Sequence, residues 1–266
     1  MKATLVSEYR KFVSTRMWWI LLIIMVVYMG ATAAGMAFMF TVDAGDTGQD
    51  AMALDPATAP SIVYTTSVSF GYVFPALIGV LSFTGEFRHK TITPTLLAVP
   101  KRGRILWAKM CAAIPMGVFY GLGGTFGCVA LGGLVLSVGG VDPQLGSADT
   151  WEIIGRSVLS TTIWLIVGVA LGSIITNQVA AIVTLIVFTQ FIEPIARIAL
   201  PAAPGGDAIA QYLPGGAGDA IAGGSFYALS SSTELLPLWA AIAVLLGYAV
   251  LFAAIGRVTT LKRDIS

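Results

Sequence analysis

The sequence has few of the residues from which catalytic and metal sites are usually built. It contains one histidine, His89, and two cysteines among 266 residues. A single histidine excludes a metal centre built on paired histidines. Cys111 and Cys128 fall in one predicted helix, 17 positions apart (128 − 111). At ~1.5 Å per residue they are separated by roughly 25 Å, which excludes a disulfide between them.

Charge is scarce as well. Only 11% of the residues are charged, 56% are apolar, and the mean hydropathy is +0.85. A water-soluble domain of this size needs a more polar surface, so the composition predicts a membrane protein. The phosphate-binding motif GxxxxGK[ST] does not occur, so the chain cannot bind ATP by that device.

Long apolar runs are what the sequence has instead. A helix needs about 20 mostly apolar residues to cross a bilayer. The stretch 1–16 is too charged to begin a cleavable signal peptide, so we expect the first apolar run to remain and to span. The predicted fold is all-α, a single domain over 1–266 with six transmembrane helices. The expected spans are 18–40, 61–84, 108–138, 157–176, 179–200 and 236–256.

Basic residues cluster in every second connection between these spans. They lie before the first span, between the second and third, and after the sixth, whereas 41–60, 139–150 and 201–237 carry acidic residues but no Lys or Arg. The positive-inside rule then predicts a multi-pass protein of the cell inner (plasma) membrane with both termini in the cytoplasm.

The N-terminal stretch has helical periodicity. Leu5, Tyr9, Phe12 and Val13 recur at spacings of three and four, while Glu8, Arg10 and Lys11 fall largely elsewhere on the helical wheel. This pattern predicts an amphipathic helix in the inner membrane interface, with Tyr9, Arg10 and Phe12 as its characteristic residues. The alternative is a basic flank that only sets topology.

The segment 201–235 is rich in Gly and Pro and still fairly apolar. It suits a loop with short helical pieces that re-enters the outer leaflet and packs on protein, because irregular backbone at that depth must be covered or wet. The alternative is a mobile external loop.

Span five contains two ionisable residues near its outer end. Glu193 and Arg197 lie four positions apart, so they share a helix face and can form an ion pair that braces an outer gate. Ionisable groups within a span are costly, so contact with a substrate is the second interpretation.

Small residues four positions apart predict where helices approach closely. Pro75 and Pro115 are expected to kink spans two and three. The small-residue pairs are Gly117 and Gly121, Gly123 and Gly127, and Gly168 and Gly172.

The connection between spans two and three, 85–107, holds a dense group of charges with an apolar pair inside it. Its sequence GEFRHKTITPTLLAVPKRGRILWAK resembles the corresponding loop of type-2 ABC-transporter permeases. That family is similar in size, with six spans, an amphipathic N-terminal helix and cytoplasmic termini. The resemblance covers the whole chain in architecture and about 25 residues by motif. Lys90 stands where the family often has a glycine before the threonine.

The resemblance implies that this loop forms a short coupling helix in a cleft of a separate ATPase subunit. Two ATPase copies, which bind ATP and Mg, and a second permease copy or a related permease would complete the transporter. This chain would bind no cofactor, and its other partner is membrane lipid, not nucleic acid. Two adjacent leucines that face the cytosol are expected to be buried in a groove of a partner protein. Glu86 is expected to pair with a basic partner group or with Arg88 or Arg104. The residues expected to couple are Glu86, Arg88, Thr91, Leu96, Leu97, Pro100 and Arg104.

The resemblance further implies an exporter whose path is lined mainly by spans two and five. Their faces are apolar with scattered hydroxyls and aromatic rings, which suits an amphipathic or lipid-like substrate. The candidate path or gate residues are Tyr72, Phe188, Glu193 and Arg197. The alternative function is a membrane anchor or assembly factor that holds a cytosolic partner without transport. An intramembrane enzyme would need polar side chains clustered in mid-span, which the sequence lacks.

Overall fold

The computed structural model describes residues 2–41, 57–92, 94, 102–229 and 235–260, and this part of the chain is helical without strands. The helices are α1 (Lys2–Ser14), α2 (Met17–Thr41), α3 (Ala59–Ser69), α4 (Val73–Arg88), α6 (Arg102–Gly127), α7 (Gly133–Val138), α8 (Ala148–Gly172), α9 (Gln178–Val187), α10 (Glu193–Ala199), α11 (Gly206–Ala210), α12 (Pro214–Ala222) and α13 (Leu238–Thr259).

Six helices in the described part are long and apolar enough to cross a membrane, which confirms the predicted number. The fourth begins about two turns earlier than expected, at Ala148. Its first turns carry Asp149, Glu152 and Arg156, so hydropathy alone places the start too late. The six spans are Met17–Thr41, Ala59–Arg88, Gly103–Val138, Ala148–Gly172, Gln178–Ala202 and Leu238–Thr259.

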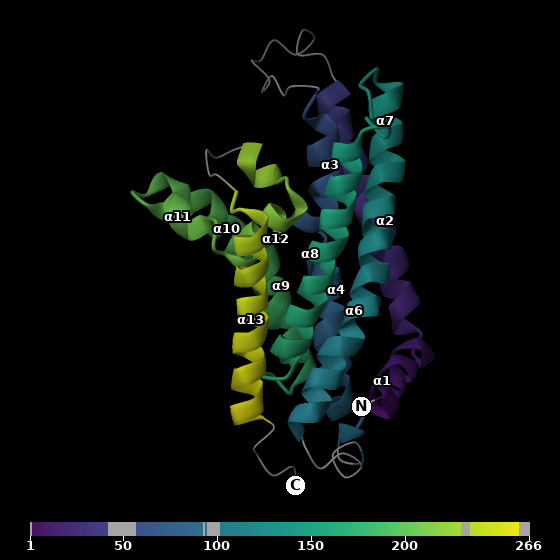
Figure 1. The fold of residues 1–266 in the computed structure, drawn as a ribbon, viewed down its shortest axis with the longest axis vertical. Helices are drawn as coiled ribbons and strands as arrows, with labels where there is room; N and C mark the ends of the chain where they lie inside the picture. Colours follow the sequence, from purple (N-terminus) through teal and green to yellow (C-terminus); the bar gives the residue numbers. More distant parts are fainter. Residues whose placement is uncertain (1, 42–56, 93, 95–101, 230–234, 261–266) are drawn as a thin grey trace.

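Helix α8 is the centre of the bundle, and α3, α4, α6, α12 and α13 pack around it (Figure 1). Glycines permit the closest of these approaches. A Cβ added at Gly117 would lie 2.6 Å from the Thr162 Cα, and one at Gly168 would lie 2.1 Å from the Ala76 carbonyl oxygen. All six glycines predicted at helix contacts have such a neighbour within 3.0 Å, which confirms that prediction.

Span two is broken rather than kinked. Helix α3 ends at Ser69 and α4 begins at Val73. Pro75 has no N–H, so it cannot continue the α-helical hydrogen bonding onto the Gly71 carbonyl, which accepts instead from the Phe74 N–H at 3.1 Å. The proline therefore sits in the first turn of a new helix, where an N–H has no intrahelical partner anyway. Pro115, in contrast, lies inside α6, which continues through it.

Two spans contain a π-helical turn. One, Cys128–Gly132, joins α6 to α7, and the other, Phe188–Ile192, joins α9 to α10. After the second turn, α10 and α11 extend sideways from the bundle (Figure 1). The chain then returns through α12 and a 3₁₀ turn at Phe226–Leu229, and α12 packs against α3, α8 and α13.

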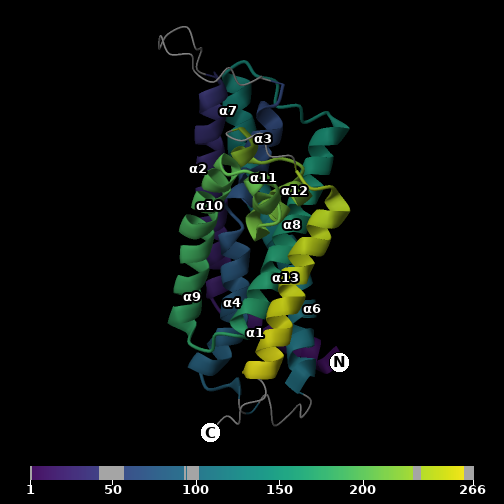
Figure 2. The same ribbon diagram turned by 90° about the vertical axis from the view of Figure 1, so that its left-hand side faces the viewer.

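The two ends of the bundle differ in content. Helix α1, the end of α4, the beginning of α6 and the end of α13 gather at one end, which we call the α1 end (Figure 2). Helix α7 and the beginning of α8 lie at the opposite end, called here the α7 end. Helix α12 lies in the half nearer the α7 end (Figure 1).

Candidate functional site

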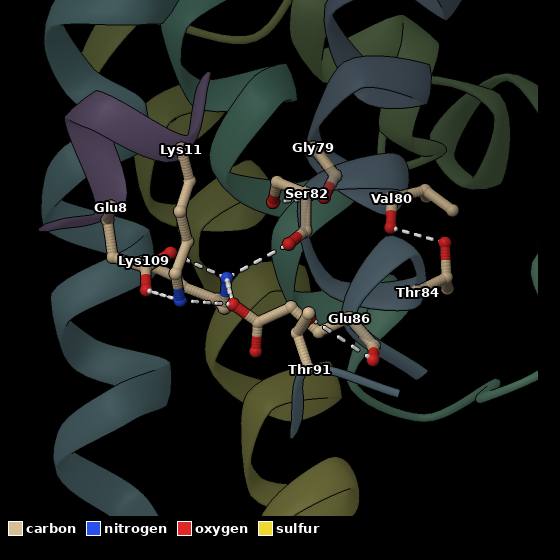
Figure 3. A network of polar contacts seen from close by, with 9 residues as sticks. All are labelled: Glu8, Lys11, Gly79, Val80, Ser82, Thr84, Glu86, Thr91 and Lys109. Atoms are coloured by element: carbon tan, nitrogen blue, oxygen red, sulfur yellow. Dashed lines mark hydrogen bonds and ion pairs between the residues drawn. The ribbon is translucent and has the colours of Figure 1, made fainter. Parts of the chain in front are cut away.

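The α1 end holds a cluster of four charged side chains from three helices, the α1 network (Figure 3). Glu8 and Lys11 come from α1, Glu86 from the last turn of α4, and Lys109 from α6. The Lys11 ammonium contacts Glu8 Oε1 at 2.8 Å and Glu86 Oε1 at 2.7 Å. Lys109 contacts Glu8 Oε2 at 2.6 Å and Glu86 Oε1 at 2.9 Å. The network therefore joins α1 to both spans that flank the charged segment 89–101.

Lys109 is the centre of this network. It is 4% exposed, and it donates to Glu8, to Glu86 and, at 2.9 Å, to the Ser82 carbonyl. An ammonium group has three protons, and each has an acceptor here. The two acids balance the two bases, so the cluster has no net charge.

Two titratable groups of the α1 network, Glu8 and Lys11, lie on α1, outside the spans. Burial alone would raise the pKa of Glu8, but Lys109 and Lys11 together hold that pKa below its ordinary value of 4.5. Burial would lower the pKa of Lys11, and the carboxylates of Glu8 and Glu86 raise it above 10.5 instead. Both groups are charged across the neutral range. Glu86 Oε2 is buried and has no hydrogen-bond partner among the described residues.

The buried face of α1 differs from the sequence prediction. The helical wheel put Glu8 and Lys11 on the polar side, but Glu8 is 6% exposed and faces the protein. Tyr9 and Arg10 are exposed, whereas Phe12 is half-buried. The wheel was wrong here because Lys109, the partner that makes a buried acid tolerable, lies 101 positions away.

Aromatic rings add to the attachment of α1. The Phe12 ring lies 6.3 Å from that of Trp18 and 6.4 Å from that of Tyr120. The Tyr120 hydroxyl donates to the Trp18 carbonyl. Helix α1 is therefore fixed to α6 by both charge and ring contacts.

The residues predicted to couple this chain to an ATPase differ in their environments. Glu86 is buried and pairs with lysines of α1 and α6, so its expected pairing with Arg88 or Arg104 is wrong. Arg88, Thr91 and Arg104 are exposed. Leu96, Leu97 and Pro100 lie outside the described residues.

Helix α4 ends in a turn of the Schellman type. The Thr91 N–H donates to the Glu86 carbonyl at 2.9 Å, and the Lys90 N–H donates to the Phe87 carbonyl at 3.2 Å. Lys90 has a φ of 56°, in the left-handed region that glycine adopts without strain. Lys90 stands where the permease family that this loop resembles often has glycine, and its backbone conformation is one that glycine adopts more readily than lysine.

A second buried cluster, the α12 network, lies in the half of the molecule nearer the α7 end. Asp219 of α12 is its first centre. Its carboxylate accepts from Arg197 at 2.6 Å, from Ser69 at 2.9 Å and from the Ser225 hydroxyl. Arg197 also donates to Ser225 at 3.1 Å and lies over the Tyr227 ring, 4.1 Å from its centroid.

Glu193 is the second centre of the α12 network. Its Oε2 atom lies 3.1 Å from the Tyr72 hydroxyl oxygen, and its carboxyl group accepts from the Gly215 N–H in the first turn of α12. Tyr72 lies in the break of span two, and its hydroxyl is also 2.8 Å from the Thr189 carbonyl, which belongs to the π-helical turn of span five. The two irregular parts of spans two and five therefore meet at one tyrosine.

This geometry corrects the predicted ion pair of span five. Arg197 pairs with Asp219, and Glu193 turns toward Tyr72 and Gly215 instead. The sequence interpretation considered only neighbours on the same helix, and it missed a partner on α12. Of the predicted path residues, Tyr72, Glu193 and Arg197 come together in this network. Phe188 is half-buried at the beginning of the adjoining π-helical turn.

The sequence interpretation gave no site role to six members of these networks: Glu8, Lys11, Ser69, Lys109, Asp219 and Ser225. The available signal for Asp219 was an acid inside the glycine-rich apolar stretch PGGAGDAIAGG. A carboxylate in such surroundings requires a buried partner. Nothing in the described part of the chain gathers three His, Cys, Asp or Glu side chains as a metal site would.

Comparison with known proteins adds no relative to these observations: no family model matches the chain, and a search of curated proteins found no match.

Proposed function

We propose that this chain is the membrane-spanning permease subunit of an ATP-binding-cassette transporter, driven by a separate ATPase subunit. The observation that carries the proposal is the α1 network. It ties α1 to the last turn of α4 and to α6, the two helices on either side of the charged segment 89–101. A load on that segment or on α1 therefore reaches both spans together.

The mechanical part of the proposal follows from this connection. The ATPase subunits bind the segment that contains Leu96 and Leu97, and α1 lies beside them in the inner membrane interface. When ATP draws the ATPases together, the α1 end of the bundle moves with them. Helices α4 and α6 both pack on α8, so the movement passes into the centre of the bundle. Two packings of similar free energy, biased by the partner, are sufficient for alternating access.

Charge supports an orientation with the α1 end in the cytoplasm of the cell inner membrane. Arg10, Arg88 and Arg104 are exposed at this end. The positive-inside rule favours the cytoplasmic side for such groups. In that orientation the α12 network lies toward the outer side, and 201–235 is an outer segment whose helix α12 packs against α3, α8 and α13.

The substrate class follows from the surfaces of the spans. Spans two and five are apolar, and Phe188 is half-buried at the beginning of the π-helical turn of span five, whereas Tyr72 is buried against that turn. An amphipathic or lipid-like molecule moving outward between two permease copies fits these surfaces better than a small ion.

The test is a complex of the full-length chain with a candidate ATP-binding-cassette ATPase, reconstituted in lipid nanodiscs. Leu96→Ala/Leu97→Ala should weaken ATPase binding by about tenfold or more, because buried anchors dominate such interfaces. Leu122→Ala, at an exposed leucine of α6, is the matched control and should leave binding unchanged.

Two results would count against the permease. Unchanged binding by the double variant would remove the coupling segment from the proposal. Binding without any change in ATP turnover would favour the membrane anchor, because an anchor holds its partner without using the ATPase cycle.

A further inference from the structure

The α12 network contains two carboxylates but only one positively charged side chain. Glu193, Asp219 and Arg197 are 1%, 0% and 8% exposed. If both acids were ionised, the cluster would hold one uncompensated negative charge away from water, which is strongly unfavourable. A buried group in this position is expected to bind a proton instead.

Asp219 is the acid that the arginine compensates. Its two carboxylate oxygens accept from Arg197, Ser69 and Ser225. The Ser225 oxygen in turn accepts from Arg197 and from the Tyr227 N–H. Each of the three groups that contact the Asp219 carboxylate donates a proton of its own, so both carboxylate oxygens act as acceptors, which is the pattern of an ionised carboxylate.

Glu193 has only uncharged hydrogen-bond partners, and its contact with Tyr72 has one proton too few. The Tyr72 oxygen lies 2.8 Å from the Thr189 carbonyl oxygen and 3.1 Å from Glu193 Oε2. The phenol supplies one proton, and the carbonyl supplies none. When Tyr72 donates along the shorter contact, the longer contact requires a proton on Glu193.

We propose that Glu193 binds one proton per chain and that this proton holds α12 against spans two and five. The protonated carboxyl donates to Tyr72 and accepts from the Gly215 N–H at the beginning of α12. The titratable or charged groups that surround it are Tyr72, Arg197, Asp219, Tyr227 and Tyr248.

Loss of the proton would change this contact in a defined way. Glu193 would become a second anion close to Asp219, and Arg197 would no longer neutralise the cluster. Glu193 is the first residue of α10, and Asp219 belongs to α12. The repulsion between the two carboxylates therefore acts between α10 and α12. The structure thus contains a pH-sensitive attachment between the outer segment and the spans. It goes beyond the proposed transport function and does not depend on an ATPase.

The direct test is infrared spectroscopy of the purified full-length protein in nanodiscs. A protonated buried carboxyl gives a C=O band that is separate from carboxylate bands and shifts in D₂O. We expect wild-type protein at neutral pH to have this band at an intensity of one carboxyl per chain, and Glu193→Gln to lack it. Glu152→Gln, at an exposed carboxylate of α8, is the matched control and should keep it.

The consequence is tested by hydrogen exchange of residues 214–222, corrected for the intrinsic effect of pH. Exchange in wild type should rise as the infrared band is lost at high pH. The glutamine variant should stay protected throughout, because its amide donates to Tyr72 and accepts from Gly215 as the protonated acid does.

Three results would overturn the proposal: a wild type without the band, a Glu193→Gln variant that retains it, and pH-dependent exchange that is the same in both proteins. If the glutamine variant does not accumulate, Tyr72→Phe provides a second measurement. It removes the acceptor of the carboxyl proton, so the band should remain but move, and an unmoved band would also overturn the proposal.

Discussion

The α1 network and the α12 network solve the same problem, charge inside a membrane protein, in two different ways. The α1 network has two acids and two bases and borders water through Lys11, whose side chain is 39% exposed. The α12 network has two acids and one base, and its charged members are nearly completely buried. A balanced cluster fixes helices across a wide pH range, whereas an unbalanced one depends on a proton. The first suits a permanent joint, and the second suits an attachment that can be released.

The largest effect is expected from breaking the ion pair of the α12 network. Arg197→Met leaves the Asp219 carboxylate buried with only hydroxyl donors, and the free energy of unfolding should fall by about 3–5 kcal/mol. Equilibrium unfolding in mixed micelles measures this. Arg156→Met, which breaks a partly exposed pair with Glu152 on α8, should cost less than about 1 kcal/mol.

A double variant sharpens this result. Adding Asp219→Asn to Arg197→Met removes the orphaned charge and should recover part of the lost stability, since most of the cost comes from leaving one charge unpaired. If the double variant were less stable than Arg197→Met alone, unpaired charge would not be the cause.

A smaller loss is expected in the α1 network. Lys109→Met leaves Glu8 and Glu86 buried, but Lys11 still contacts both, so the loss should be about 2–3 kcal/mol. Lys11→Met should cost less than about 1 kcal/mol, because its ammonium is partly in water and Lys109 keeps both acids paired. Equal losses in the two variants would contradict the central place of Lys109. Under the proposed function, Lys109→Met should also reduce the response of the ATPase without preventing its binding.

The pH dependence of the α1 network should be flat near neutrality. The folded-state pKa of Glu8 lies below 4.5, so its contribution is present above the unfolded pKa and is lost as the pH falls through the folded one. The pKa of Lys11 is raised above 10.5, so its contribution is present below that value and is lost as the pH rises through the folded pKa. Thermal unfolding from acid to alkaline pH measures both limits. Glu8→Gln should weaken the acid limit, and an unchanged acid limit would remove Glu8 from this role.

Hydropathy predicted the spans well because each span is a local property of about 20 residues. Glycine spacing likewise predicted where α6 and α8 approach, since a missing side chain acts at its own position. The charge networks were not predictable in the same way. Glu8 pairs with a residue 101 positions away, and Ser69 bonds to one 150 positions away. Helical wheels treat such acids as solvated because they contain no information about a partner on another helix.

The backbone of span two was also only partly predictable from the sequence. The sequence predicted a kink at Pro75, but the helix ends at Ser69 and begins again at Val73. A proline acts only on the turn that precedes it. The break leaves Tyr72 between the two helices, where its hydroxyl contacts Thr189 and Glu193 of span five. Local chemistry predicted where span two is irregular, but it contained no information about these contacts with span five.

The smallest effect is expected at Lys90, whose backbone is in the left-handed conformation at the α1 end. A non-glycine residue in the left-handed region costs about 1–2 kcal/mol, and glycine's greater freedom in the unfolded chain offsets about half of that gain. Lys90→Gly should therefore raise the free energy of unfolding by about 0.5–1 kcal/mol, whereas Arg88→Gly, inside α4, should lower it by a similar amount. Both variants remove one surface cation, but only Lys90 has a positive φ. A gain in stability that is confined to Lys90→Gly would therefore come from relief of backbone strain in the turn and not from the loss of a surface charge. A loss of stability in both variants would mean that the lysine side chain contributes more than its backbone costs.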